Sequence, residues 1–392
     1  MSKWKYPALL LLLICLCGAS LTLPTTAAEM NSVAMEPPVI SAQSAILLEA
    51  ESGNAVYEKR CDTPLPMAST TKIMTALTAL MLADPEQVIT VDASAVGIEG
   101  SSIYLEEGEQ LTLQQLLYAL LLESANDAAV AIAIGTAGSV EAFAERMNAI
   151  AADLGLVNTH FTNPHGLDDE NHYTTARELA MIAGALLDSP LLRTIVSTRK
   201  TTIPHPTAGN VRLLINHNKL LRMYDGCIGL KTGFTKRSGR CLVSAAERDG
   251  VTLIAVTINA PDDWQDHMRL FDYGFSKFES VLLCEENQYL HPLALVNGTD
   301  AYVMVSNAQA LSVTLPVGHG NIQSTIELPR FEYAAIGNGA QVGKVVFRCD
   351  TDEDGKTEII GEAPLTACYT VEKRAPKRSF WQWLKDLFCG RL

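Results

Sequence analysis

The sequence predicts an α+β domain, followed by a small all-β domain and an amphipathic C-terminal helix. Three observations lead to this fold class. Strand-like patterns lie at both ends of the region 44–275, with helical patterns between them. Beyond residue 281, short β-like runs are separated by Pro, Gly and Asn, and the last fifteen residues carry an apolar face. The 392 residues are 48% hydrophobic, which is enough for a sizeable core and excludes a disordered chain.

The N-terminus has the pattern of a secretory signal. Lys3 and Lys5 precede an apolar run at 8–16, and small residues end the segment near Ala28. A permanent membrane helix is the alternative, but the run is shorter than the roughly 20 residues that a span requires. We therefore expect residues 1–28 to be a signal peptide and the mature protein to be exported.

The first domain, predicted at residues 29–279, begins with a β-hairpin and continues with helices. The stretch "AILLEAESGNAVYEKR" alternates in hydrophobicity and turns at Ser52-Gly53-Asn54. A capping-box spacing of Thr175 and Glu178 marks the start of the last of four helical patterns. The four patterns cover residues 73–81, 112–138 with a break near Ser124, 140–155 and 174–187.

Three further strands and a closing helix complete this domain. Strand patterns cover 226–235, 240–247 and 252–260, and Arg248-Asp249-Gly250 joins the last two as a hairpin turn. A helical pattern at 268–275 follows them. Because strands lie at both ends of the domain, the sheet must be assembled from distant segments, which is the arrangement of an α+β fold.

Residues 281–370 have a different character. Short runs such as "AYVMVS", "LSVTLP" and "KVVFRC" predict a small β-sandwich or barrel. Neither catalytic pairs nor metal-ligand clusters stand out in this region, so we interpret it as a spacer or docking module.

The C-terminal segment, 371–392, is a basic linker followed by an amphipathic helix. At about 100° per residue, the apolar side chains fall on one side and Gln382, Lys385 and Asp386 fall on the other. A basic helix with tryptophans at its apolar edge is typical of a membrane-surface anchor. The alternative is a terminal helix that docks on the protein's own core. The expected membrane contacts are Phe380, Trp381, Trp383, Leu384, Leu387 and Phe388.

Charge and cysteine content exclude other classes of function. The formal net charge of −14 argues against a general affinity for nucleic acid. Seven cysteines remain after the signal peptide, without CxxC or His-rich spacing, so neither a disulfide framework nor a metal site is predicted. We interpret most of them as core residues, although the sequence leaves a Cys349–Cys368 bridge open.

The stretch "PMASTTKIMTAL" places a hydroxyl and an amine at the head of an apolar helix. Ser69 and Lys72 are three residues apart, so both lie on one helix face. In the first turn, free backbone amides favour a developing oxyanion, and a lysine with a lowered pKa can act as base toward the serine. SxxK alone is weak: an ordinary helix cap explains it as well, and a second match at 197–200 runs into a proline-containing segment.

Two further motifs follow in order. Ser124-Ala125-Asn126 interrupts an apolar helical run, where a helix break with local side-chain caps is the simpler explanation. Lys231-Thr232-Gly233 lies in a strand between Leu230 and Phe234, and Gly233 leaves room for a ligand's backbone to approach. Taken by itself, the Lys231-Thr232-Gly233 motif would be interpreted as a strand-end turn.

The ordered set SxxK, SxN, KTG resembles the penicillin-recognising serine enzymes. The fuller stretches "PMASTTKIMTAL", "LLLESANDAAVAIA", "FTNPHGLDDENHYTTARELA" and "IGLKTGFTKRSGRCLV" look like the low-molecular-mass D-alanyl-D-alanine carboxypeptidases in particular. The resemblance extends over residues 44–275. It implies a transpeptidase/β-lactamase-like catalytic domain, peptidoglycan stem peptides as substrate, β-lactams as covalent inhibitors and no cofactor or metal.

The resemblance also implies a role for each motif residue. Ser69 would attack the carbonyl of the penultimate D-alanine, Lys72 would take its proton, and Ser124 would pass a proton to the leaving D-alanine. The remaining motif residues would bind substrate. Asn126 would hold its peptide group, Lys231 and Thr232 its terminal carboxylate, and the strand at Gly233 and Phe234 its backbone, with the amides of Ser69 and Phe234 as oxyanion hole.

Two features of the sequence bear on the roles that the resemblance implies. The "NPHGL" stretch also matches the family; we interpret His165 as structural, with a role in shaping the cleft as the alternative. Some family members carry an arginine between the last strand and the closing helix, where this chain has Asp263 or Trp264. The pocket for the carboxylate is therefore expected to be built differently here.

Three alternative functions remain at the level of sequence. A β-lactamase would need a carboxylate that activates the deacylating water, and the ExxLN pattern that supplies it in one class is absent. A peptidoglycan D,D-endopeptidase differs only in pocket shape. A catalytically silent wall-binding protein is disfavoured because all six polar motif residues are intact.

Overall fold

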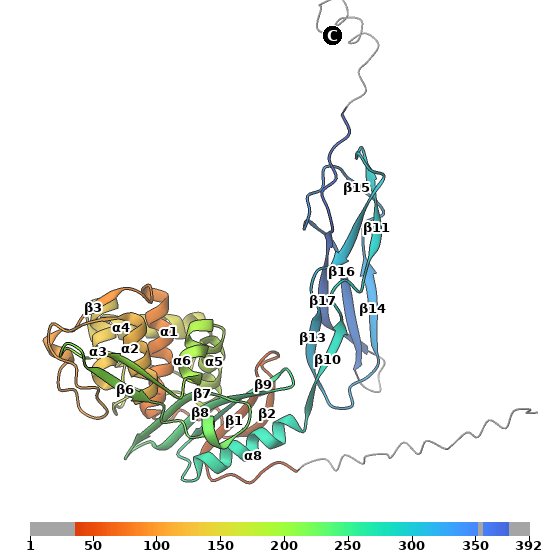
Figure 1. Cartoon of the computed structure of the whole chain (residues 1–392). Coiled ribbons are helices and arrows are strands. Elements are labelled where there is room, and N and C mark those ends of the chain that lie inside the picture. The colour runs from red at the N-terminus through yellow and green to blue at the C-terminus, as the bar shows by residue number, and fades with distance from the viewer. Residues whose placement is uncertain (1–35, 352–355, 376–392) are drawn as a thin grey trace, which may run out of the picture. The chain divides into compact units, whose positions relative to one another are not determined.

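The computed structural model describes residues 36–351 and 356–375 (Figure 1). The predicted signal peptide, residues 1–28, lies outside the described residues, and so does the amphipathic helix predicted for the C-terminus. The expected membrane contacts Phe380, Trp381, Trp383, Leu384, Leu387 and Phe388 are therefore not described.

A five-stranded sheet forms the centre of the first domain. Its strand order is β2-β1-β9-β8-β7 and every neighbouring pair is antiparallel. The first strand of the chain, β1, thus pairs with the distant strand β9, as expected for an α+β fold. The bounds are β1 Ser44–Glu49, β2 Ala55–Lys59, β7 Cys227–Thr235, β8 Gly239–Arg248 and β9 Val251–Ile258.

Helices cover one face of this sheet and a single long helix covers the other (Figure 1). One apolar core lies on each side of the sheet, between the sheet and the helices that cover it, because both faces of the central strands carry buried side chains. The covering helix on the second face is α8 Asp263–Phe275. The other α-helices are α1 Lys72–Leu82, α2 Leu113–Tyr118, α3 Asn126–Ala137, α4 Val140–Asp153, α5 Ala176–Leu187, α6 Pro190–Ser197 and α7 Leu220–Met223.

Short elements connect these helices. The 3-10 turns are η1 Ala68–Thr71 and η2 Ala93–Ala95, and a π-helical turn, η3 Ala119–Glu123, follows α2. Two small hairpins complete the domain, β3 Val88–Thr90 with β4 Gln110–Thr112, and β5 Lys200–Pro204 with β6 Val211–Ile215.

The predicted start of α5 is confirmed, but its capping box is only half formed. Thr175 accepts a hydrogen bond from the backbone amide of Glu178, as expected for an N-cap. The Glu178 carboxylate does not return to Thr175. It accepts instead from the amides of Val157 and Asn158 and from the Thr159 hydroxyl, so it ties the preceding loop to the helix.

Helix α6 and the β5–β6 hairpin were not predicted. The second SxxK match falls at their junction, with Ser197 at the end of α6 and Lys200 at the start of β5. The two side chains therefore do not share a helix face, because the chain changes from helix to strand between them.

The second domain is β-rich, as predicted. A six-stranded sheet has the order β14-β16-β17-β12-β11-β15, and a separate pair is β10-β13. Residues of both contribute to one apolar core, which is the arrangement of two packed sheets. The bounds are β10 Phe278–Cys284, β11 His291–Val296, β12 Tyr302–Asn307, β13 Leu311–Pro316, β14 Ile322–Glu327, β15 Glu332–Tyr333, β16 Gln341–Thr351 and β17 Lys356–Ala367.

The Cys349–Cys368 bridge that the sequence leaves open is not formed, and both thiols are free. Cys349 faces Glu358 near the turn between β16 and β17. Cys368 follows the other end of that ladder, where Thr366 faces Gln341. The two cysteines are kept apart because they lie at opposite ends of the same hairpin.

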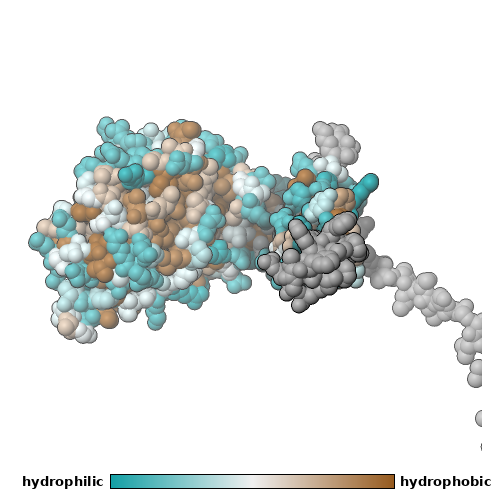
Figure 2. Space-filling view, turned by 90° about the horizontal axis from the view of Figure 1, so that it is seen from above, coloured by the Kyte–Doolittle hydropathy of each residue, from teal (hydrophilic) through white to brown (hydrophobic). Residues whose placement is uncertain are grey.

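Apolar side chains also reach the surface of the helix-containing domain. Figure 2 shows hydrophobic patches among hydrophilic residues on the face seen from above. Exposed apolar residues of α1 and α5 include Met81, Leu82 and Met181. In the described part of the chain no single helix is long and apolar enough to cross a membrane; two bent pairs, α3–α4 and α5–α6, meet the length and composition test only together.

Candidate active site

Ser69 lies in the turn η1, immediately before helix α1. The backbone of Ala68 takes a left-handed conformation (φ 50°), and the Thr70 and Thr71 hydroxyls bond back to the carbonyls of Met67 and Ala68. These local bonds fix the turn against the fully buried Met67. Ser69 itself is only partly buried, so its hydroxyl stays accessible at the head of the helix.

Lys72 is the first residue of α1, and its side chain is fully buried. Its Nζ lies 3.1 Å from Ser69 Oγ, 2.7 Å from Asn126 Oδ1 and 2.6 Å from the backbone oxygen of His165. Burial, reinforced by the nearby charge of Lys231, holds the pKa of Lys72 well below its ordinary value of 10.5. The arrangement therefore favours an uncharged amine beside the serine.

The NPHGL turn, residues 163–167, places the His165 carbonyl beside Lys72 Nζ. Asn163 holds the turn: its Oδ1 accepts from the amides of His165 and Gly166, and its Nδ2 donates to the Leu167 carbonyl. A Cβ on Gly166 would lie 2.0 Å from the Ala68 carbonyl oxygen, so only glycine fits there. The His165 ring accepts from the Leu167 amide, and burial lowers its pKa to about 3. The contact with Lys72 is thus made by the backbone, and the ring stabilises the turn.

The SxN motif occupies the break between η3 and α3. Ser124 ends η3 in a left-handed conformation (φ 61°), and Asn126 begins α3. The Asn126 amide Nδ2 donates to the Glu99 carbonyl, which fixes its Oδ1 toward Lys72. This break therefore has a second cause besides local capping, because its side chains are committed to neighbouring segments.

Asp127 is a positioning residue that sequence reasoning did not identify. Its carboxylate is fully buried and accepts from the Ser102 hydroxyl and from the amides of Ile103 and Leu105. It thereby holds the loop that places Ser101 at the cleft. Its position next to Asn126 was the only sequence signal, and it did not reveal the partner loop.

The KTG motif lies on β7, the edge strand of the sheet. Lys231 is almost fully buried, its Nζ donates to the Thr232 carbonyl at 2.9 Å, and burial lowers its pKa to about 7. A Cβ on Gly233 would lie 3.1 Å from the Ser69 backbone nitrogen, so the strand passes close to the serine. The Phe234 side chain is 66% exposed beside this edge.

These segments meet at one cleft of about 370 Å³. Of the expected site residues, Ser69, Ser124, Thr232, Gly233 and Phe234 line it directly. Lys72 and Asn126 do not line the cleft, but the Lys72 amine contacts both Ser69 Oγ and Asn126 Oδ1. Lys231 precedes Thr232 on β7, and its buried side chain does not line the cleft either. The structure adds Ser101, His217, Lys219, Arg240, Asp263 and Trp264 to the lining.

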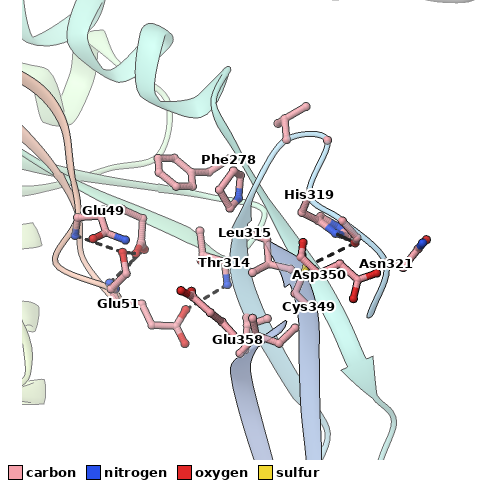
Figure 3. Close-up of a pocket in the computed structure, with 18 residues that line it drawn as sticks. Glu49, Glu51, Phe278, Thr314, Leu315, His319, Asn321, Cys349, Asp350 and Glu358 are labelled. Atoms are coloured by element: carbon pink, nitrogen blue, oxygen red, sulfur yellow. Dashed lines mark hydrogen bonds between the residues drawn. The ribbon is translucent and has the colours of Figure 1, made fainter. Parts of the chain in front are cut away.

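A larger cavity, of about 870 Å³, holds none of these residues (Figure 3). Figure 3 shows Glu49 bonded to its own turn: its carboxylate accepts from the amides of Glu51 and Ser52. The buried charge is thus used to close the β1–β2 hairpin. The cavity has no serine–lysine pair, so size alone does not locate the chemistry.

No group of three His, Cys, Asp or Glu side chains that could hold a metal ion occurs within residues 36–351 and 356–375. The polar groups that converge at the cleft are hydroxyls, amines and amides. Groups of these types can act as nucleophile, base and hydrogen-bond donors, which are the functions that acyl transfer requires.

Comparison with known proteins identifies the family. Residues 31–262 match the family model described as D-alanyl-D-alanine carboxypeptidase. The chain belongs to this family. It is therefore a serine-type hydrolase with the fold of penicillin-binding proteins, and the resemblance predicted from the three motifs is confirmed.

Relatives of the D-alanyl-D-alanine carboxypeptidase family match nearly the whole chain. DacA of Escherichia coli (strain K12) is 35% identical over 91% of this chain and 90% of its own length. DacF of Bacillus subtilis (strain 168) is 30% identical over 88% of this chain and 90% of its own.

Solved structures share the fold. Penicillin-binding protein 5 from Haemophilus influenzae has a TM-score of 0.63 and 28% identity, and covers 86% of this chain and all of that one. The D-alanyl-D-alanine carboxypeptidase from Mycobacterium tuberculosis H37Rv has a TM-score of 0.59 and 31% identity over 62% of this chain and 94% of that one. The β-rich second domain is thus part of the shared architecture with the first of these structures.

Proposed function

We propose that this D-alanyl-D-alanine carboxypeptidase removes the terminal D-alanine from peptidoglycan stem pentapeptides through an acyl-enzyme on Ser69. The Ser69 proton moves to Lys72 while Oγ attacks the carbonyl carbon of the penultimate D-alanine. The C–N bond then breaks, and the leaving amine takes a proton by way of Ser124. Water hydrolyses the resulting ester and restores Ser69.

The hydrogen-bond inventory of Lys72 carries this proposal. A neutral amine has two N–H donors and one lone pair. The Asn126 Oδ1 and the His165 carbonyl oxygen accept only, so they take both donors at 2.7 and 2.6 Å. The lone pair is then left for Ser69 Oγ at 3.1 Å, with the hydroxyl donating to the amine. Lys72 is thereby arranged as a general base rather than as a counter-ion.

Substrate binding is assigned to the strand edge and the SxN break. Lys231 supplies positive charge behind Thr232, and both would attract the terminal carboxylate, while Asn126 would hydrogen-bond the substrate's peptide group. The amides of Ser69 and Phe234 would stabilise the oxyanion. The close approach of Gly233 to the Ser69 nitrogen supports this, because any larger residue would crowd that position.

The same acylation explains β-lactam inhibition, and the site is poorly equipped for fast release. Asp263 is the one carboxylate side chain that lines the described cleft, and it is paired with Arg240. Of the neighbouring carboxylates, Asp127 accepts from the Leu105 amide and Glu123 accepts from the Ile215 amide of β6. A carboxylate that would activate a deacylating water is thus not at hand among these residues, which disfavours a β-lactamase.

We also propose the domain limits and location that the sequence predicts. The catalytic domain would comprise residues 29–279 and the small β-sandwich domain 281–370. The start of β10 at Phe278 supports a boundary near 279. The signal peptide would direct export and would be cleaved after residue 28. The apolar face of 380–388 would hold the enzyme on the outer face of the cytoplasmic membrane.

Mass spectrometry of wall pentapeptides incubated with the purified protein tests the activity. We expect loss of one alanine with the wild type and none with Ser69→Ala. A labelled penicillin should bind covalently to the wild type and not to this variant. Unchanged pentapeptide with the wild type, despite labelling, would contradict the carboxypeptidase assignment. Cleavage of cross-linked dimers in its place would favour the D,D-endopeptidase.

A further inference from the structure

Arg240 carries a guanidinium at the cleft that no motif of the sequence accounts for. It lies near the start of β8 and lines the cleft together with Ser69 and Thr232. In the antiparallel register of β7 and β8 it faces Phe234 directly, and Thr232 faces Leu242. Arg240 and Thr232 are therefore diagonal neighbours on one face of the sheet, within reach of a long side chain.

The guanidinium is held in place by two residues of α8. Its Nη2 donates to Asp263 Oδ1 at 2.8 Å, and its carbon lies 5.7 Å from the centre of the Trp264 ring. The Asp263 carboxylate is itself fixed, because it also accepts from the Trp264 amide and its side chain is only 3% exposed. A long side chain restrained in this way loses little further freedom on binding a ligand.

The Arg240 guanidinium has N–H groups that its hydrogen bond to Asp263 does not use. Its Nε is buried and has no hydrogen-bond partner, although an unsatisfied buried donor is costly. An arginine presents five N–H groups in a planar fork that matches a carboxylate, and the hydrogen bond to Asp263 uses only one side of it. The Arg240 side chain is 43% exposed and lines the cleft, so the N–H groups that the Asp263 hydrogen bond does not use are open to an anionic ligand.

We propose that Arg240 recognises the free carboxylate at the substrate's C-terminus, with Thr232 beside it and with Asp263 and Trp264 as positioning residues. This inference rests on the proposed carboxypeptidase function and deepens it. It supplies the arginine that some relatives are expected to place between the last strand and the closing helix. Here Asp263 and Trp264 occupy that segment, and the cation reaches the same cleft from β8.

Among the side chains that line the cleft, Lys219 is the rival to Arg240, whereas Lys231 is buried behind Thr232. Lys219 is exposed at the start of α7, and within the described residues no ion pair involves it. A freely rotating ammonium is a less selective partner for a planar carboxylate than a restrained guanidinium. The two assignments are separable, because the two side chains come from different elements.

The test compares two peptides that end in D-alanyl-D-alanine, one with a free carboxylate and one with a C-terminal amide. For Arg240→Leu in the full chain we expect kcat/KM on the free acid to fall by about 10- to 100-fold, the usual loss of a charge-assisted hydrogen bond. The loss should appear mainly in KM. Hydrolysis of the amide should change by less than about threefold, and Arg240→Lys should recover part of the activity on the acid.

Arg237→Leu is the matched control, since it removes the same charge from the exposed turn of this hairpin outside the cleft lining. It should not alter the preference between acid and amide. Equal losses on both peptides with Arg240→Leu would reduce Arg240 to a structural tie between the sheet and α8. Loss of preference with Lys219→Leu alone would transfer the role to Lys219.

A binding measurement separates this inference from the proposed reaction. In a Ser69→Ala background, calorimetry with the same two peptides requires no turnover. We expect Arg240→Leu to weaken binding of the acid by about 10-fold or more and to leave the amide unchanged. If the wild type hydrolyses neither peptide, the proposed function fails while this binding result still decides on Arg240. Equal binding of acid and amide before and after the substitution would overturn the assignment.

Discussion

The backbone carbonyl of His165 accepts a hydrogen bond from Lys72 Nζ at 2.6 Å. The two residues are 93 positions apart in the sequence, and the bond depends on the close contact of Gly166 with the Ala68 carbonyl. The state of the Lys72 amine is therefore set by the path of a loop as well as by burial.

Gly166→Ala should disrupt this relationship. The new Cβ would lie 2.0 Å from the Ala68 oxygen at a residue whose φ is 87°, so the loop must move away from Lys72. We expect β-lactam acylation to slow by about 10-fold or more, with a loss of stability of roughly 1–3 kcal/mol. Gly155→Ala is the control: its φ is also positive (74°), but open space surrounds the new Cβ, so acylation should persist. Normal acylation in Gly166→Ala would show that the carbonyl is dispensable.

The pH dependence of acylation should report the two lysines. The rate rises as Lys72 loses its proton, at a pH well below 10.5, because burial and Lys231 disfavour the charged amine. Deprotonation of Lys231, at a pKa of about 7, lowers the rate because the pull on the ligand's carboxylate weakens. Stopped-flow acylation across pH measures both limbs. Lys72→Arg, which cannot deprotonate, should lose about 100-fold or more and show no rising limb. An unchanged rising limb in that variant would exclude Lys72 as the base.

Acid should destabilise the protein through its buried histidines. Burial lowers the pKa of His172 to about 4 and that of His267 to about 3, so the unfolded chain binds their protons first as pH falls. Stability is therefore complete above about pH 6.5 and declines below it, by about 1.4 kcal/mol per pH unit for each histidine. Thermal unfolding at pH 7 and pH 5 measures this. His267→Gln should reduce the drop in Tm, whereas His205→Gln in the loop 205–210 should not. The same drop in both variants would contradict the assignment.

The buried pair of Arg212 and Glu109 should matter more than surface pairs. Arg212 also donates to the Tyr104 carbonyl, so it anchors the segment behind Ser101 to β6. Glu109→Gln leaves a buried guanidinium without its counter-charge and should cost roughly 3–5 kcal/mol in urea unfolding. Glu362→Gln, which breaks the exposed pair with Lys344, should leave the urea midpoint nearly unchanged. Similar midpoints for the two variants would disprove the anchoring role.

Deletion of residues 378–392 should release the enzyme from membranes with its activity largely kept. The expected cause is loss of the apolar face that contains Trp381 and Trp383. Flotation with anionic lipid vesicles measures the release. Trp381→Ala with Trp383→Ala should weaken flotation, whereas Gln382→Ala on the polar side should not. Retention of the truncated enzyme on vesicles would refute the anchor.

Local features were predictable because they depend on neighbours in the sequence. The cap at Thr175, the turn at Ser52-Gly53-Asn54 and the helix predicted over 73–81 follow from side chains within a few residues of each other. Helix α6 and the β5–β6 hairpin were missed because their patterns are short, and an edge strand tolerates Pro204.

The ordered motifs in this chain were sufficient to indicate the family, and with it a serine, a lysine base and a second lysine. Only the tertiary structure decided what completes the site. The His165 carbonyl accepts a hydrogen bond from Lys72, Asp127 holds the loop beside Ser101, and Arg240 lies at the cleft beside Thr232. The physical reason is range. A motif records the side chains that one segment contributes, whereas the charge of a buried amine and the reach of a guanidinium are set by backbone atoms and partners that only folding brings near.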